Sequence, residues 1–467
     1  MNTFLTAVAA AMILGAPASA QDRATPAVRA TLAHTEDRFS LDLVFDRDAP
    51  VWVFVESEVI GQGRGWRLDP WTVETPGVLL ETVDGHDRLR ATTGGPVPRQ
   101  VRLRLTPRFV DLQASYDPVL TFSTGATAWY SEAFNLVPLD SVEAAAGLPD
   151  DLTPMAEATG PARVTWSDAD GPVLFDGRRE IGPVSEGAGT YVLFGPAAVA
   201  STDELTTVID PGLPAWIGEE LGTWAPRVAD EYRRRLGPGG SDRPMVMMSW
   251  TGPTPGATSM AGSVLPHLVV MAFEGDGVVE PSAGVRSMAR WFIGHESAHF
   301  WLGETVHYQG PQDSWITEGG ADLMAVRASE ALDPGYSGKA RLQQSVDDCV
   351  ALGAQPVSTA SARGQHRAHY ACGAVFALIA EGAQRRAGGG DWFDFLRPLI
   401  DASRADKVLT REEWLSALTA VSGDPSLRAD IERLLDEGDA EAAATVASLL
   451  QRAGVAATRR EGRVLLD

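Results

Sequence analysis

Basic residues are scarce in this chain of 467 residues. Lys and Arg together number 39, against 62 Asp and Glu, so the formal net charge is −23. An acidic surface of this size repels polyanions and argues against nucleic acid and anionic membranes as partners. The hydrophobic fraction of 44% and the charged fraction of 22% are typical of a globular protein with a sizeable core and two or three domains.

Long apolar runs are scarce as well. The first twenty residues, MNTFLTAVAAAMILGAPASA, carry no charged side chain, have an apolar centre and end in the small triplet Ala18-Ser19-Ala20. This pattern predicts a secretory signal peptide at 1–20, cleaved before Gln21. A membrane-anchoring helix is the alternative, but an apolar centre of about a dozen residues is short for a span of roughly 20.

No later segment approaches membrane length, and no cysteine follows the predicted cleavage point to receive a lipid. We therefore expect an exported protein, periplasmic or extracellular, without a stable membrane span after signal cleavage. The only two cysteines are Cys349 and Cys372, 23 positions apart. Because the expected compartment is oxidising, this even count predicts one disulfide; two free buried thiols are the alternative.

The first part of the chain has the pattern of an all-β domain. Short β-branched and aromatic runs lie at 51–59, 99–110 and 190–196, and turn-forming residues separate them. We assign a β-rich domain to 21–200.

The pattern changes near residue 200. It predicts a helix at 214–236, a strand at 243–250, an extended run at 263–273 and mostly helices afterwards. Residues 424–455 have the pattern of two amphipathic helices with acidic, solvated faces. We therefore predict a multidomain α+β protein, with a second domain at 201–435 and a C-terminal helical tail at 436–467.

The segment 290–304, RWFIGHESAHFWLGE, places two histidines in an apolar run. His295 and His299 lie one helical turn apart on the inward face, so they can bind one metal ion together. In the pattern H-E-x-x-H the two imidazoles bind zinc, and Glu296 takes a proton from a zinc-bound water. The alternative is two core histidines that are satisfied by hydrogen bonds.

A catalytic zinc ion normally has three protein ligands and one open position. The pattern H-E-x-x-H-x-x-G-x-x-H does not apply, because Leu302 and Thr305 occupy its glycine and histidine positions. After eighteen intervening residues comes Glu318, in the segment DSWITEGGADLM. A carboxylate from a second helix would complete a site of two histidines and one glutamate.

These segments resemble the gluzincin metallopeptidases, and within them the aminopeptidase N-like branch. HESAHFWLG is similar to that branch's H-E-x-x-H-x-W-x-G, and DSWITEGGA is similar to its D-x-W-L-N-E-G-x-A. HYACGAVFALI is similar to the segment whose tyrosine faces the zinc, which implies that Tyr370 is the catalytic tyrosine. The resemblance covers roughly 205–435 and implies a thermolysin-like mixed sheet followed by a mostly helical catalytic domain.

The resemblance implies an exported zinc metallopeptidase that hydrolyses peptides or proteins, with one Zn²⁺ per chain. His295, His299 and Glu318 would hold the zinc, and Glu296 would be the general base for a zinc-activated water. Tyr370 would donate a hydrogen bond to the developing oxyanion.

Asp322 follows Glu318 by one helical turn, and this spacing suits an acceptor for the second N–H of His295. A solvent-facing aspartate is the alternative.

One segment departs from the branch. Its exopeptidases carry G-x-M-E-N beside the zinc, where the glutamate binds the free amino end of the substrate. Aligning Gly262 with the glycine places Leu265 and Pro266 at the glutamate and asparagine positions. We therefore expect little discrimination between free and blocked N-termini, unless Glu274 or Glu304 takes the missing place. Exopeptidase and endopeptidase action both stay open at this point.

Two other functions are compatible with these segments. One is a non-catalytic zinc-binding member of the same fold that acts as a peptide-binding or envelope module. The other is an envelope structural protein in which the motif is accidental. The intact Glu296 and the matching Tyr370 favour the hydrolase.

Overall fold

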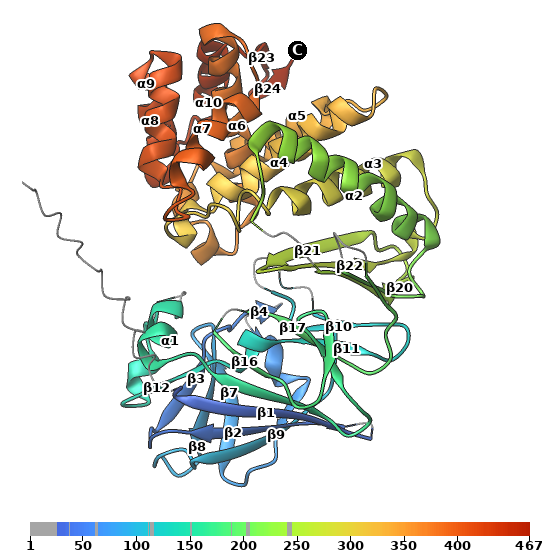
Figure 1. Cartoon of the computed structure of the whole chain (residues 1–467). Coiled ribbons are helices and arrows are strands. Elements are labelled where there is room, and N and C mark those ends of the chain that lie inside the picture. The colour runs from blue at the N-terminus through green and yellow to red at the C-terminus, as the bar shows by residue number, and fades with distance from the viewer. Residues whose placement is uncertain are drawn as a thin grey trace, which may run out of the picture.

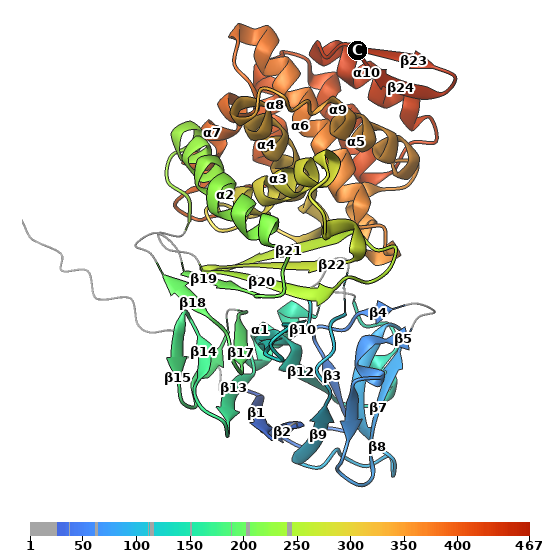
Figure 2. The same ribbon diagram turned by 90° about the vertical axis from the view of Figure 1, so that its right-hand side faces the viewer.

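The computed structural model describes residues 26–36, 38–60, 64–110, 112, 116–149, 152–187, 189–201, 206–240 and 245–467. The predicted signal peptide lies outside these residues. In Figure 1 a β-rich part lies at the bottom, a mixed sheet in the middle and a helical part at the top. The turned view in Figure 2 shows the same order.

The β-rich part contains three sheets. Strands such as β1 and β2 alternate buried and exposed residues, because successive side chains point to opposite faces of a sheet. The first sheet has the order β16 (Val184–Glu186), β13 (Arg163–Asp168), β1 (Val28–Thr35), β2 (Arg38–Phe45), β9 (Gln100–Leu105) and β6 (Trp71–Val73). The second has the order β10 (Val119–Thr121), β11 (Thr127–Tyr130), β17 (Tyr191–Phe194), β14 (Val173–Phe175) and β15 (Arg178–Glu180), and the third β12 (Leu136–Leu139), β3 (Val51–Phe54), β8 (His86–Ala91) and β7 (Val78–Val83).

Smaller elements complete the β-rich part. They are the pair β4 (Val59–Ile60) and β5 (Arg64–Gly65), the helix α1 (Thr153–Thr159), and the 3-10 turns η1 (Trp66–Leu68), η2 (Ser131–Phe134) and η3 (Glu143–Ala145).

The mixed sheet is covered on both faces. Its order is β18 (Val199–Ser201), β19 (Thr206–Ile209), β20 (Met245–Gly252), β22 (Leu268–Glu274) and β21 (Ser259–Leu265), and β21 is an edge strand antiparallel to β22. Met245 and Met247 pack with residues of the β-rich part, whereas Val246 and Met248 pack with the helices. The first six residues of β20, MVMMSW, are buried, which fits their mostly apolar sequence.

Beyond residue 206 the described chain contains nine α-helices. They are α2 (Ala215–Leu236), α3 (Ala283–Ala298), α4 (Trp315–Leu332), α5 (Lys339–Leu352), α6 (Arg367–Gly388), α7 (Trp392–Ser403), α8 (Arg411–Ser422), α9 (Pro425–Asp436) and α10 (Ala442–Ala453). Among the described residues, no helix is both long and apolar enough to cross a bilayer.

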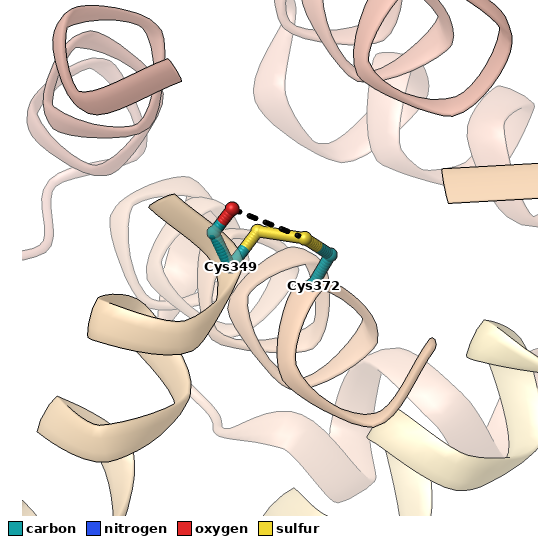
Figure 3. The surroundings of a disulfide bond; sticks show 2 residues. All are labelled: Cys349 and Cys372. Atoms are coloured by element: carbon teal, nitrogen blue, oxygen red, sulfur yellow. Dashed lines mark hydrogen bonds between the residues drawn. A yellow bond between two sulfur atoms is a disulfide. The ribbon is translucent and has the colours of Figure 1, made fainter. Parts of the chain in front are cut away.

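The predicted disulfide is confirmed. Cys349 on α5 and Cys372 on α6 are bonded and fully buried, and Figure 3 shows the bridge between the two helices. It links α5 to the helix that carries Tyr370.

The predicted C-terminal helical tail at 436–467 contains α10, but the prediction is wrong for the last residues. After α10 the chain forms a hairpin of β23 (Ala457–Arg460) and β24 (Arg463–Leu466). Glu461 and Gly462 have φ values of 49° and 80°, which fits the tight turn that joins two antiparallel strands. The four-residue strands carry three arginines, so their sequence lacks the apolar alternation by which strands are predicted.

Candidate metal centre

The two histidines lie at the C-terminal end of α3. Ser282 caps the start of this helix by accepting a hydrogen bond from the N–H of Val285. His295 lies in the last turn and is 4% exposed, and His299 directly follows the helix. The inward position of both side chains follows from their four-residue spacing.

Two glycines bring the other site residues together. A Cβ on Gly319 of α4 would lie 2.1 Å from the carbonyl carbon of Gly373 on α6, so only glycine permits this helix contact. Glu318 directly precedes Gly319, and Tyr370 lies less than one helical turn before Gly373. The close contact therefore places the carboxylate and the phenol beside each other.

Three potential ligand atoms converge. The Nε2 atoms of His295 and His299 lie 3.2 Å apart. Glu318 Oε2 lies 3.4 Å from His295 Nε2 and 3.6 Å from His299 Nε2. Two imidazole nitrogens and one carboxylate oxygen are a donor set that zinc prefers.

The other ring nitrogens face acceptors. His299 Nδ1 lies 2.9 Å from the carbonyl oxygen of Leu302, and His295 Nδ1 lies 2.9 Å from Asp322 Oδ1. A proton on each Nδ1 leaves both Nε2 atoms with lone pairs directed at each other. Because Glu318 Oε2 is buried without a well-aligned donor among the described residues, the three atoms fit a shared cation.

The charges of the centre also favour a cation. Burial opposes ionisation of Glu318, but the neighbouring His299 and His295 outweigh it and lower its pKa to about 2. Burial lowers the pKa of His295, but Asp322 and Glu318 outweigh this effect and raise it to about 10. Positive charge is thus stabilised between these residues.

Glu296 faces the edge of the mixed sheet. It is 5% exposed, and burial raises the pKa of its carboxyl group. A Cβ on Gly262 of β21 would lie 2.4 Å from Glu296 Cδ. The absence of a side chain at 262 therefore makes room for this carboxylate.

Tyr370 lies beside the candidate metal ligand His295. Its ring stacks with that of His295 at a centroid distance of 5.9 Å. The charge of Glu318, together with burial, raises the pKa of Tyr370 well above its usual value, so the hydroxyl keeps its proton and can donate it in a hydrogen bond.

Glu274 and Glu304 are the two candidates to replace the glutamate of G-x-M-E-N, which binds a free amino end. Both form other hydrogen bonds. Glu274 accepts a hydrogen bond from the hydroxyl of Thr254, and Glu304 accepts one from the N–H of His267. Leu265 is 4% exposed and packs toward the β-rich part.

One residue near the centre was not predicted. The hydroxyl of Tyr116, in the β-rich part, donates a hydrogen bond to the carbonyl oxygen of Val264 on β21 at 3.3 Å. The two residues are 148 positions apart, and no local pattern connects them.

Comparisons with known proteins agree with this architecture. No protein-family model matches the chain, and no curated protein matches it in sequence. A similar solved structure is that of an aminopeptidase N family protein from Idiomarina loihiensis, with a TM-score of 0.60, 11% identity and coverage of 93% of this chain and 79% of that chain. Native leukotriene A4 hydrolase from Saccharomyces cerevisiae has a TM-score of 0.51, 13% identity and coverage of 89% and 68%.

At these identities the likeness shows a common fold. The predicted fold class, a β-rich part followed by a mixed sheet and a mostly helical part, is confirmed.

Proposed function

We propose that this protein is a zinc metallopeptidase with one zinc ion per chain, bound by His295, His299 and Glu318. The convergence of their three ligand atoms, beside the carboxyl group of Glu296 and the hydroxyl of Tyr370, carries the proposal.

Bound zinc would lower the pKa of a water molecule and polarise the scissile carbonyl. Glu296 would accept a proton from the attacking water and return it to the leaving amine. Burial raises the pKa of Glu296, which makes its carboxylate a stronger base toward the attacking water. The carboxylic acid that forms can still pass its proton to the leaving amine, because the amine is the more basic group. Tyr370 would donate a hydrogen bond to the developing oxyanion.

Two further groups would orient the imidazoles. Asp322, which is 2% exposed, would hold His295 through Nδ1, and the carbonyl of Leu302 would hold His299 in the same way. Such contacts select the tautomer in which Nε2 is free to bind the metal.

We further propose that the protein is exported. The pattern of residues 1–20 and the disulfide between Cys349 and Cys372 support this proposal, because disulfides persist in oxidising compartments.

Metal analysis and a mixed peptide library test the function. The purified protein should contain about one zinc per chain and cleave library peptides. Glu296→Gln should keep the zinc but lower kcat by roughly 10²–10⁴-fold, because an amide cannot transfer the proton. Glu304→Gln is the matched control and should keep turnover, since that half-buried glutamate accepts a hydrogen bond from the N–H of His267.

The outcomes distinguish the candidate functions. Zinc without any turnover by the wild-type chain would favour the non-catalytic peptide-binding module. A chain without zinc would refute the proposed site.

A further inference from the structure

Strand β21 exposes alternate backbone groups at the edge of the mixed sheet. Leu265 and Leu268 are paired across the two-residue turn Pro266-His267. In an antiparallel pair, hydrogen-bonded residues alternate with residues whose N–H and C=O groups point to the other side. Gly262 and Val264 therefore direct these groups to the outer edge, which we call the open edge because no other described strand pairs with it.

The open edge passes beside the candidate catalytic glutamate. Gly262 lies against Glu296, as the 2.4 Å distance from its notional Cβ shows. An extended peptide that pairs with the backbone of Gly262 would bring a peptide bond next to this carboxylate.

Tyr116 occupies the next open position. Its hydroxyl bonds the carbonyl oxygen of Val264, so a peptide cannot pair with that group without displacing the phenol. Tyr116 packs against Tyr130, at 4.7 Å between ring centroids, and Tyr130 packs against Tyr191 at 5.3 Å. The Tyr191 hydroxyl bonds the carbonyl of Asp117. Tyr116 therefore packs against a tyrosine cluster of the β-rich part.

The position of Glu296 divides the edge of β21 into two stretches. Glu296 would return the proton to the leaving amine, so the carboxyl half of the substrate begins beside Glu296 and Gly262. The amino half is assigned to the stretch that leads from Gly262 to Val264 and Tyr116.

We propose that Tyr116 is a specificity-determining residue that limits the length of the amino-side fragment by closing one end of the peptide-binding edge of β21. Val264 is two residues from Gly262, and a strand advances about 3.3 Å per residue, so roughly two substrate residues fit before the phenol. Leu265 offers an apolar side chain where a carboxylate would bind the free amine of a substrate. The shape of the site at Tyr116, and not recognition of a free amine, therefore limits the length of the amino-side fragment. The proposal rests on the proposed function.

Product lengths test the proposal. A ten-residue peptide, supplied with a free and with an acetylated N-terminus, is digested, and the fragments are identified by mass spectrometry. The wild-type protein should release amino-side fragments of roughly one to three residues from both forms. Tyr116→Ala should raise the proportion of fragments of four or more residues at least tenfold.

Two further variants control for stability and for loss of a hydroxyl group. Tyr116→Leu also shortens the side chain but keeps apolar packing, and it should release the longer fragments if Tyr116→Ala fails to fold. Tyr191→Phe removes a hydroxyl of the same tyrosine cluster and should keep the wild-type fragment lengths.

The results separate this proposal from the function on which it rests. Unchanged fragment lengths in folded Tyr116→Ala or Tyr116→Leu, or long amino-side fragments from the wild-type protein, would overturn the role of Tyr116 while the peptidase stands. A change confined to carboxyl-side fragments would overturn the assigned direction. A zinc-loaded wild-type protein without turnover would overturn the peptidase function itself, and this proposal with it.

Discussion

The β-rich part and the helical part each bury a polar cluster, but the two clusters are satisfied differently. In the β-rich part, Arg67 is fully buried, lies 3.2 Å from Asp87 and donates to the backbone carbonyls of Glu56 and Ala133. The two terminal nitrogens of Arg67 therefore donate to acceptors. In the helical part, three acceptor atoms lie close together: Nε2 of His295, Nε2 of His299 and Oε2 of Glu318.

This difference separates a structural cluster from a candidate functional one. A buried ion pair whose partners satisfy each other needs nothing further, although the loss of one partner is costly. Converging acceptors are stable only with a proton or a metal ion between them. Substitutions in the Arg67 cluster should therefore lower stability more than activity, and substitutions in the His295 cluster should lower activity more than stability.

Removing a ligand should have the largest effect on activity. His299→Ala should lose the zinc and lower kcat/KM by about 10³-fold or more, because one of three protein ligands is missing. The unfolding transition of the β-rich part should stay unchanged. Zinc content and peptide turnover are the measurements, and full zinc retention would contradict the ligand assignment.

Removing the buried arginine should have the reverse effect. Arg67→Ala should destabilise the protein by about 3–5 kcal/mol, because Asp87 would be left buried without its partner. Chemical denaturation measures the loss, and the folded fraction should still bind zinc. Arg102→Ala is the control: its ion pair with Asp42 is largely exposed, so the expected change is below about 1 kcal/mol.

The disulfide tests the helical part alone. Replacing Cys349 and Cys372 together by alanine should cost roughly 3 kcal/mol in the chain-entropy model, given the loop of 23 residues. The unfolding of the β-rich part should not respond. Thiol labelling of the unreduced, denatured wild-type protein should find no reactive thiol, and two thiols per chain would show that the bridge does not form.

The smallest expected effect concerns pH and the β-rich part. Burial raises the pKa of Glu132 from 4.5 to about 7, and the nearby Glu56 adds to this. Because the folded pKa exceeds the unfolded one, the folded protein loses stability as the pH rises from about 4.5 through 7. Glu132→Gln should remove this loss and stabilise the protein by on the order of 1 kcal/mol at pH 8, with little effect at pH 4. Equal unfolding midpoints of both proteins at pH 8 would contradict the prediction.

Much of the architecture was predictable because its signals are local. The helix predicted at 214–236 is α2 (Ala215–Leu236), and the extended run at 263–273 contains parts of β21 and all but the last residue of β22. Amphipathic spacing and apolar runs depend on residues a few positions apart. The hairpin at β23 and β24 was missed because its short, arginine-rich strands have no such pattern.

The sequence by itself determined which residues can serve as the metal ligands and which cysteines can pair. A spacing of four on one helix forces His295 and His299 onto one face, and a chain with two cysteines allows only one intramolecular bridge. Only the tertiary structure decided that Gly262 lies against Glu296 and that Tyr116 reaches Val264. These contacts join distant segments, and they depend on how the β-rich part packs against the edge of the mixed sheet, for which no local periodicity exists.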